Sequence, residues 1–136
     1  MGRILGIDYG IKNCGLAATD TLKIAVHGLR TVTTNTLWDW LNKYLVEEDV
    51  EKIVIGRTTH KDGTTLYFQT DVDDLVLRLN KTFPQVTIDF HEEAFTSVKA
   101  QAIILQSGVK KQKRQVKSLL DKISAVVILQ EYLKHI

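Results

Sequence analysis

Acidic side chains stand at three places in this sequence where a purely structural role does not ask for them. Asp8 ends the short apolar run that begins at residue 4, and Glu92 and Glu93 directly follow the alternating segment 86–90. Asp121 lies among apolar residues near the start of the last helical pattern. Because ligands of open α/β sheets gather beyond the carboxyl ends of the strands, Asp8 and the glutamate pair are expected to converge there. Asp121 joins them if its helix packs across that edge.

Carboxylates that are brought together repel one another unless a cation neutralises them. Magnesium prefers oxygen ligands and keeps water molecules that can attack a phosphodiester, and in a two-metal site the second ion stabilises the leaving oxygen. The three acidic positions therefore predict a site for Mg²⁺, or equally Mn²⁺. Two of these acids also have a simpler interpretation. Asp8 can form a turn with Tyr9 and Gly10, and Asp121 can offset the helix dipole.

The positive charge of the chain is concentrated just before Asp121. The whole sequence has a formal net charge of +2, but residues 110–122 carry six basic residues and one acid, so the remainder is net negative. A concentrated basic patch favours a polyanionic partner, although a solvated helix face would show the same composition. The basic residues that we predict to contact nucleic acid are Lys12, Arg57, Lys110, Lys111, Lys113, Arg114 and Lys117.

The elements that must position these side chains can be read from the apolar pattern. Apolar or alternating runs predict strands over residues 4–8, 14–19, 22–32, 52–56 and 86–90. Spacings of three and four predict helices over residues 37–45 after a Thr34–Thr36 cap, 66–82, 96–105 and about 119–133. Strands separated by helices need crossover connections, so the pattern predicts one α/β domain over residues 1–136 with a partly parallel sheet covered on both faces.

Composition excludes several other classes of protein. The single cysteine, Cys14, cannot form an intramolecular disulfide or a thiolate pair for zinc, and its neighbours predict a small buried thiol in a strand. No apolar run approaches the roughly 18 residues of a membrane span, and the first residues do not have the layout of a signal peptide. We therefore expect a cytoplasmic protein with no membrane partner.

Four ordered blocks of the sequence resemble the YqgF family of RNase H-like nucleases, which are related to Holliday junction resolvases. The first block is residues 6–12 with Gly15-Leu16-Ala17 and Asp20. The second is residues 53–56 with Asp62-Gly63-Thr64, the third is Phe95-Thr96-Ser97 with Ala100, and the fourth is residues 121–125 with 128–130. The resemblance spans nearly the whole chain and includes the basic run.

The resemblance implies an RNase H-like fold with a five-stranded mixed sheet, in which three antiparallel strands come first and two more are added through helices. It also implies a metal-dependent acidic triad. The implied activity is cleavage of nucleic acid during maturation of the 5′ end of precursor 16S ribosomal RNA. Asp8 corresponds to the first acid and Asp121 to the last. Anchoring on Thr96-Ser97 makes Glu93 the middle acid, which is the assignment that we expect. Anchoring on the preceding strand gives Glu92 as the alternative.

Two departures from the family pattern leave alternatives open. Ala94 stands where the family has an arginine, and Arg57-Thr58 stands after Gly56 where the family tends to have Leu-Pro. Without this arginine the chain lacks a cation that could hold a phosphate, and Arg57 can partly supply the missing charge. The leading expectation is a nuclease that acts on structured RNA as a monomer or weak homodimer. The alternatives are a DNA junction resolvase and a non-catalytic RNA-binding assembly factor.

Overall fold

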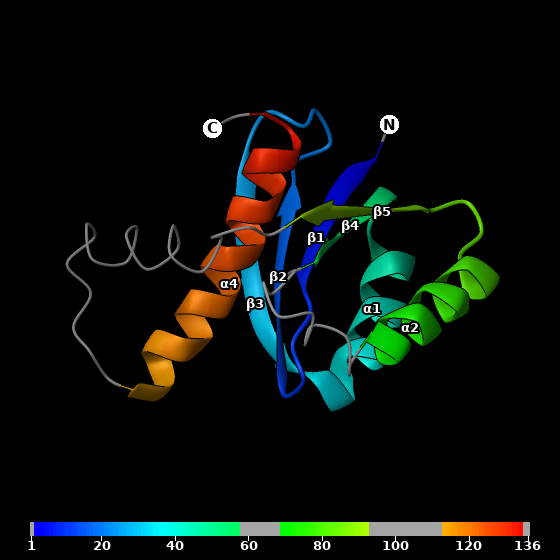
Figure 1. Ribbon diagram of the computed structural model, residues 1–136. Coiled ribbons are helices and arrows are strands. Elements are labelled where there is room, and N and C mark those ends of the chain that lie inside the picture. Colours follow the sequence, from blue (N-terminus) through cyan, green and yellow to red (C-terminus); the bar gives the residue numbers. More distant parts are fainter. Residues whose placement is uncertain (1, 58–68, 93–112, 135–136) are drawn as a thin grey trace.

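The computed structural model describes residues 2–57, 69–92 and 113–134 of the chain (Figure 1). The strands are β1 (Arg3–Asp8), β2 (Asn13–Thr19), β3 (Val26–Thr33), β4 (Val50–Arg57) and β5 (Thr87–Glu92). The helices are η1, a 3-10 turn (Thr34–Thr36), α1 (Leu37–Glu47), α2 (Gln69–Thr82) and α4 (Lys113–Tyr132). The helix expected over residues 96–105 lies outside the described residues. No helix within the described ranges is long and apolar enough to cross a membrane.

The five strands form one mixed sheet in the order β3-β2-β1-β4-β5. β1 pairs antiparallel with β2, and β2 pairs antiparallel with β3. β4 lies parallel to β1, and β5 lies parallel to β4. The expected mixed sheet is thus confirmed, and the carboxyl ends of β1, β4 and β5 lie at the same edge.

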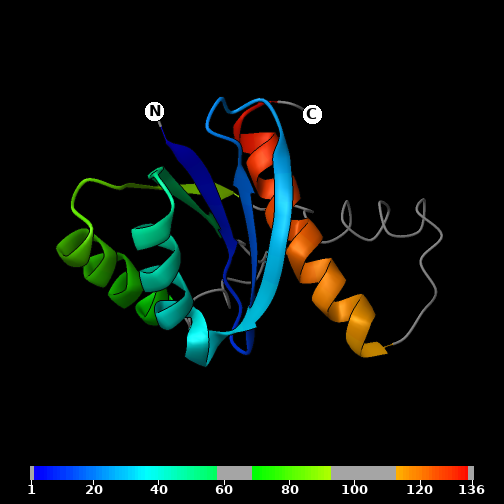
Figure 2. The ribbon, with the colours of Figure 1, turned by 180° about the vertical axis from the view of Figure 1, so that it is seen from behind.

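The sheet is covered on both faces, as Figures 1 and 2 show from its two sides. Leu5 and Ile7 of β1 belong to the core on the side of α1 and α2. Ile4 of β1 packs with Ala125, Ile128 and Leu129 of α4 on the other side. Successive residues of β1 therefore supply the two cores in turn, which is the alternation that a strand imposes on its side chains.

Two local expectations differ from the structure. β3 begins at Val26 rather than near residue 22, because the Asp20 carboxylate accepts hydrogen bonds from the backbone N–H groups of Ile24 and Ala25 and holds a turn there. The expected threonine cap of α1 is wrong as well. The hydroxyl of Thr36 donates to the carbonyl oxygen of Thr33 at 2.9 Å and makes no side-chain cap of the helix.

Candidate active site

Asp8 is the last residue of β1, and its side chain is half-buried. Asp8 comes two residues after Gly6 in β1, so the two positions share one face of the strand. A Cβ added at Gly6 would lie 2.6 Å from Cγ of Leu129 in α4. Asp8 therefore belongs to the face of the sheet that α4 covers. Its neighbours across the sheet are Gly15 of β2 and Gly56 of β4, neither of which carries a side chain. The first acid of the predicted triad thus stands at a strand end between two glycines.

The end of β5 lies two strands away from Asp8. Gly56 of β4 pairs with Asp8 on one side and with His91 on the other, so the Cα atoms of Asp8 and His91 are about 10 Å apart, two strand spacings. Glu92, the last residue of β5, pairs with Arg57. Only the backbone positions of Glu92 and Arg57 are described.

α4 crosses the sheet obliquely on the side of Asp8 (Figure 1). The aliphatic stem of Lys122 lies against Gly28 of β3, and Leu129 lies against Gly6 of β1. Position 121 comes one turn before Ser124 and Ala125, both of which are buried. The helix that carries Asp121 therefore packs on the face to which Asp8 belongs.

Several predicted site residues lie outside the described side chains. Glu93, Lys110 and Lys111 fall in the stretch 93–112, and for Lys113, Arg114, Lys117 and Asp121 only the backbone of α4 is described. Within the described residues no three histidine, cysteine, aspartate or glutamate side chains are grouped closely enough to hold a metal. Whether the triad assembles stays a prediction. Among the predicted site residues, Asp8 of the triad and Lys12 of the nucleic-acid contacts have described side chains.

Side chains near the carboxyl end of α4 bind it to β4 and β5. The ammonium group of Lys52 donates to the hydroxyl of Tyr132 at 2.9 Å, and that hydroxyl donates to Oδ2 of Asp89 at 2.7 Å. The hydrogen bond from Tyr132 and a second one from the backbone N–H of Phe90 hold the pKa of Asp89 below its usual value. The hydrogen bond to Tyr132 raises the pKa of Lys52. This chain of hydrogen bonds fixes the last turn of α4 over the parallel strands.

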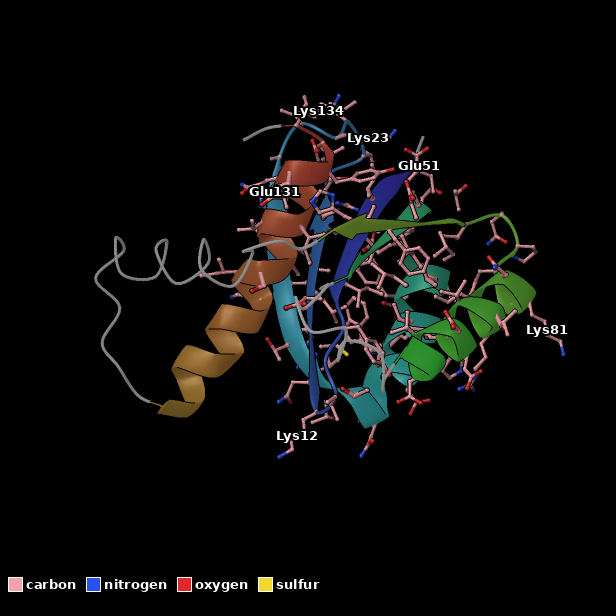
Figure 3. The ribbon with its side chains drawn as sticks, viewed as in Figure 1. Lys12, Lys23, Glu51, Lys81, Glu131 and Lys134 are labelled. Carbon is pink, nitrogen blue, oxygen red and sulfur yellow. The ribbon has the colours of Figure 1, made fainter. Side chains whose placement is uncertain are left out.

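A second contact joins α4 to the end of β5. Nε2 of His91 lies 3.1 Å from Oε2 of Glu131, and Figure 3 shows Glu131 on the upper part of α4. His91 directly precedes the Glu92-Glu93 pair in the sequence. Its partner Glu131, like Tyr132, was not anticipated, because neither residue shows a local motif. A signal that could have found them is their place on the last helix, one turn after the apolar residues Ile128 and Leu129.

The turn after Asp8 is held by backbone and hydroxyl contacts. The hydroxyl of Thr34 donates to the carbonyl oxygen of Gly10 at 2.7 Å, and the N–H of Thr34 donates to the carbonyl oxygen of Lys12 at 2.9 Å. A Cβ at Gly10 would meet the carbonyl oxygen of Asn13, so the expected role of this glycine in a sharp turn is confirmed. Lys12 is exposed at the tip of the turn.

Tyr9 points away from the face of Asp8 and lines a cavity of about 210 Å³ together with Trp38, Asp71 and Arg78. Burial raises the pKa of the Tyr9 hydroxyl, with smaller contributions from Cys14 and Asp71. The guanidinium group of Arg78 lies 4.2 Å from the centre of the Trp38 ring. The buried thiol of Cys14 in β2 agrees with the expectation from the sequence.

Comparison with known proteins identifies the family of this fold and site. Residues 2–135 match the model of the family described as RuvX: Holliday junction resolvase. The chain belongs to the RuvX/YqgF family. Membership confirms the resemblance found in the sequence and the expected class of enzyme, a hydrolase of phosphodiester bonds.

Curated relatives in this family align with nearly the whole chain. A protein of Porphyromonas gingivalis named "Putative pre-16S rRNA nuclease" is 46% identical over 133 residues, which are 98% of this chain and 96% of the relative. A protein of the same name from Phocaeicola vulgatus is 42% identical over 134 residues, with the same coverage of both chains. RuvX proteins with this name are therefore similar to the chain over almost its full length.

A solved structure confirms the RNase H-like fold. RuvC of Thermus thermophilus in complex with a Holliday junction substrate superposes with a TM-score of 0.56 at 14% sequence identity, covering 99% of this chain and 96% of RuvC. At this level of identity the likeness concerns the fold. The mixed sheet with helices on both faces is thus the architecture that RuvC shares with the RuvX chain.

Proposed function

We propose that this RuvX protein is a metal-dependent nuclease that processes the 5′ end of precursor 16S ribosomal RNA. The observation that carries the proposal is Asp8, an acid at the carboxyl end of β1 on the face covered by α4, in a chain whose family and curated relatives are nucleases. The substrate is taken from the name of those relatives.

The acids of the proposed site are Asp8, Glu93 and Asp121. The alternation of β5 supports Glu93 over Glu92: Asp89 and His91 contact α4, whereas Phe90 packs on the opposite core. Glu93 comes two residues after His91 in the sequence, and Glu92 comes two residues after Phe90. The parity of the strand thus favours the assignment that the family motif already suggested.

The proposed acids fit a hard divalent cation. They offer carboxylate oxygens, the ligands that Mg²⁺ and Mn²⁺ prefer, and the two residues that pair with Asp8 across the sheet are glycines. When bound, the cation supplies an activated water and charge stabilisation for the leaving oxygen. The protein's own contribution is to hold Asp8 and the helix of Asp121 on one face of the sheet, so that the carboxylates need not rearrange during the reaction.

The partner in this proposal is structured RNA held by its phosphates. Lys12 and the predicted basic residues of the run 110–117, together with Arg57, would position the backbone without reading its sequence. We propose that the protein acts in the cytoplasm, as a monomer or weak homodimer. We further propose that residues 1–136 form a single domain.

The test is magnesium-dependent cleavage of a precursor 16S RNA fragment labelled at its 5′ end. Asp8→Asn should remove cleavage while the thermal unfolding curve keeps its midpoint. Asp49→Asn is the matched control, because it makes the same change at an exposed site beside the start of β1, where the Asp49 carbonyl accepts from the N–H of Arg3. Undiminished cutting by Asp8→Asn would refute the assignment of the site.

The same assay separates the middle acid and the rival functions. Glu93→Gln should abolish cleavage and Glu92→Gln should leave most of it; the reverse result would transfer the role to Glu92. The family description favours a four-way DNA junction as a second substrate, so it is tested in parallel. RNA binding that is retained without any magnesium-dependent turnover would instead identify an assembly factor.

A further inference from the structure

A groove of about 540 Å³ lies between the edge strand β3 and helix α1. Its lining combines two cations, three hydroxyls and an indole ring with one acid: Arg30, Lys43, Thr31, Thr33, Thr36, Trp40 and Asp39, together with Val32. β3 is the edge of the sheet in the described structure, and Figure 2 shows it in front, leading at its lower end into η1 and α1. The groove therefore follows an accessible margin of the molecule.

The two cations of this groove are not neutralised within the described residues. Arg30 and Lys43 are both exposed, and neither has a carboxylate within 4.0 Å in the described part of the chain. Asp39 lies one turn before Lys43 on α1 but does not pair with it. Arg3 and Lys23, by contrast, do form ion pairs with glutamates. Two unpaired cations at one groove favour an anionic ligand.

The aromatic residue of the groove is held in a fixed orientation. The rings of Trp40 and Tyr44 are stacked, with 4.7 Å between centroids and 12° between planes. Trp40 is half-buried, so part of it remains accessible where it lines the groove. Cations beside an ordered aromatic ring are the combination that binds single-stranded nucleic acid, in which phosphates meet the charges and a base stacks on the ring.

The groove and Asp8 lie at the same end of the sheet, with Asp8 on the face of α4 and the α1 wall of the groove on the opposite face. Asp8 pairs with Gly15, which pairs with Thr31 of β3, so the Cα atoms of Asp8 and Thr31 are about 10 Å apart. The end of β3 is also joined to the turn after Asp8, because Thr34 bonds the carbonyl oxygens of Gly10 and Lys12. Figure 3 shows Lys12, an exposed cation in the turn from β1 to β2, at this end of the sheet.

We propose that the groove between β3 and α1 binds a single-stranded segment of the nucleic acid that crosses the site of Asp8. Arg30 and Lys43 contact phosphates of this segment, and Trp40 stacks against one of its bases. The proposal rests on the proposed nuclease function, which it extends by assigning a path for the strand away from the predicted basic run. The ligand is recognised by charge and stacking, so we expect little dependence on base sequence.

The first test is the binding of a ten-nucleotide uridine RNA without added divalent cation, so that cleavage plays no part. Arg30→Gln/Lys43→Gln should weaken binding roughly 10- to 30-fold at 0.1 M salt and lower the slope of log K against log salt by about 1.4, the value for two lost phosphate contacts. The matched control is Lys81→Gln/Lys134→Gln, which removes the same charge at exposed sites far from Lys12 in Figure 3. Equal losses in both double variants would overturn the groove and leave the nuclease assignment untouched.

The second test uses the two tryptophans as separate reporters. RNA should quench the fluorescence of Trp38→Phe, in which Trp40 remains, and should leave Trp40→Phe unchanged. Trp40→Leu keeps apolar bulk without a large aromatic face and should weaken binding by at least about 5-fold, with circular dichroism confirming the fold. Quenching that comes from Trp38 would overturn the proposal. So would sedimentation showing that Arg30 and Trp40 hold a second copy of the chain instead of RNA.

Discussion

Replacing Gly6 with alanine tests whether the close approach of α4 to β1 positions the site. A Cβ at residue 6 would lie 2.6 Å from Cγ of Leu129 and about 3 Å from both of its methyl carbons. Leu129 is completely buried in the core between α4 and the sheet, so its side chain cannot swing into solvent. The added methyl group must therefore push α4 away from β1.

The expected cost follows from overpacking a dense core. Forcing an extra methyl group into such a core destabilises a protein by about 1–3 kcal/mol, which for a chain of this length lowers the unfolding temperature by roughly 5–10 °C. Because α4 carries position 121, the folded Gly6→Ala protein should also lose roughly 10- to 100-fold in cleavage, the effect of a misplacement approaching 1 Å. Cleavage is measured well below the unfolding temperature so that the two effects separate.

A double-mutant cycle gives this reasoning a sharp test. Leu129→Ala should cost about 2–5 kcal/mol through the cavity that it leaves, and the methyl group introduced by Gly6→Ala should then fill part of that cavity. Gly6→Ala/Leu129→Ala is therefore expected to be more stable than the sum of the single variants by about 1–3 kcal/mol, measured by urea unfolding. Single effects that add within about 0.5 kcal/mol would show that the two residues do not compete for the same space, and the argument for close packing would fail.

Three further outcomes are expected. Tyr132→Phe removes the hydroxyl that bonds Asp89 and Lys52 and should lower the free energy of unfolding by about 1–2 kcal/mol in urea titrations; an unchanged midpoint would refute the role of this hydroxyl. Because hydrogen bonds lower the pKa of Asp89 in the folded protein, the contribution of its carboxylate to stability is present above about pH 4 and lost as the pH falls further. The difference in unfolding free energy between the wild-type protein and Asp89→Asn should therefore shrink toward pH 2. A difference that grows in acid would contradict this direction of the pKa shift. Gly10→Ala should open the turn after Asp8, since its Cβ meets the carbonyl oxygen of Asn13, and thermal unfolding should show a loss of about 1–3 kcal/mol; full stability would contradict the contact.

Much of the fold could be predicted from the sequence because each strand has a local signature. The apolar run that ends at Asp8 and the apolar run that ends at Gly56 are the two central parallel strands, and the helical spacing after residue 36 is α1. The start of β3 was placed too early because Leu22 and Ile24 are apolar. Both are in fact exposed, and the Asp20 carboxylate holds that stretch in a turn.

The contacts around the site could be predicted only in part. Asp8 was predicted from its place at the end of an apolar run. The face that each residue occupies depends on register, which the sequence does not reveal. The bond between Tyr132 and Asp89 joins residues 43 apart with no shared motif. Likewise, Arg30 and Trp40 line one groove because η1 turns the chain from the end of β3 into α1, which no local pattern reports.

The position of α4 links these observations into one physical argument. Asp8 and Asp121 lie at opposite ends of the sequence, so only the packing of α4 on the sheet can bring their backbones to one face. Glycines on β1 and β3 let the helix approach closely, and Tyr132 and Glu131 fix its last turn to the far strands. The helix is thus held at three points along its length, over β3, β1 and β5. A helix held at one point could pivot about it, whereas three contacts spread across the sheet fix both the distance of the helix from the sheet and the direction of its axis. The same contacts that stabilise this core therefore set the position of the helix backbone at residue 121 relative to Asp8, and we predict that a substitution beneath α4 reduces cleavage even where it leaves every acid in place.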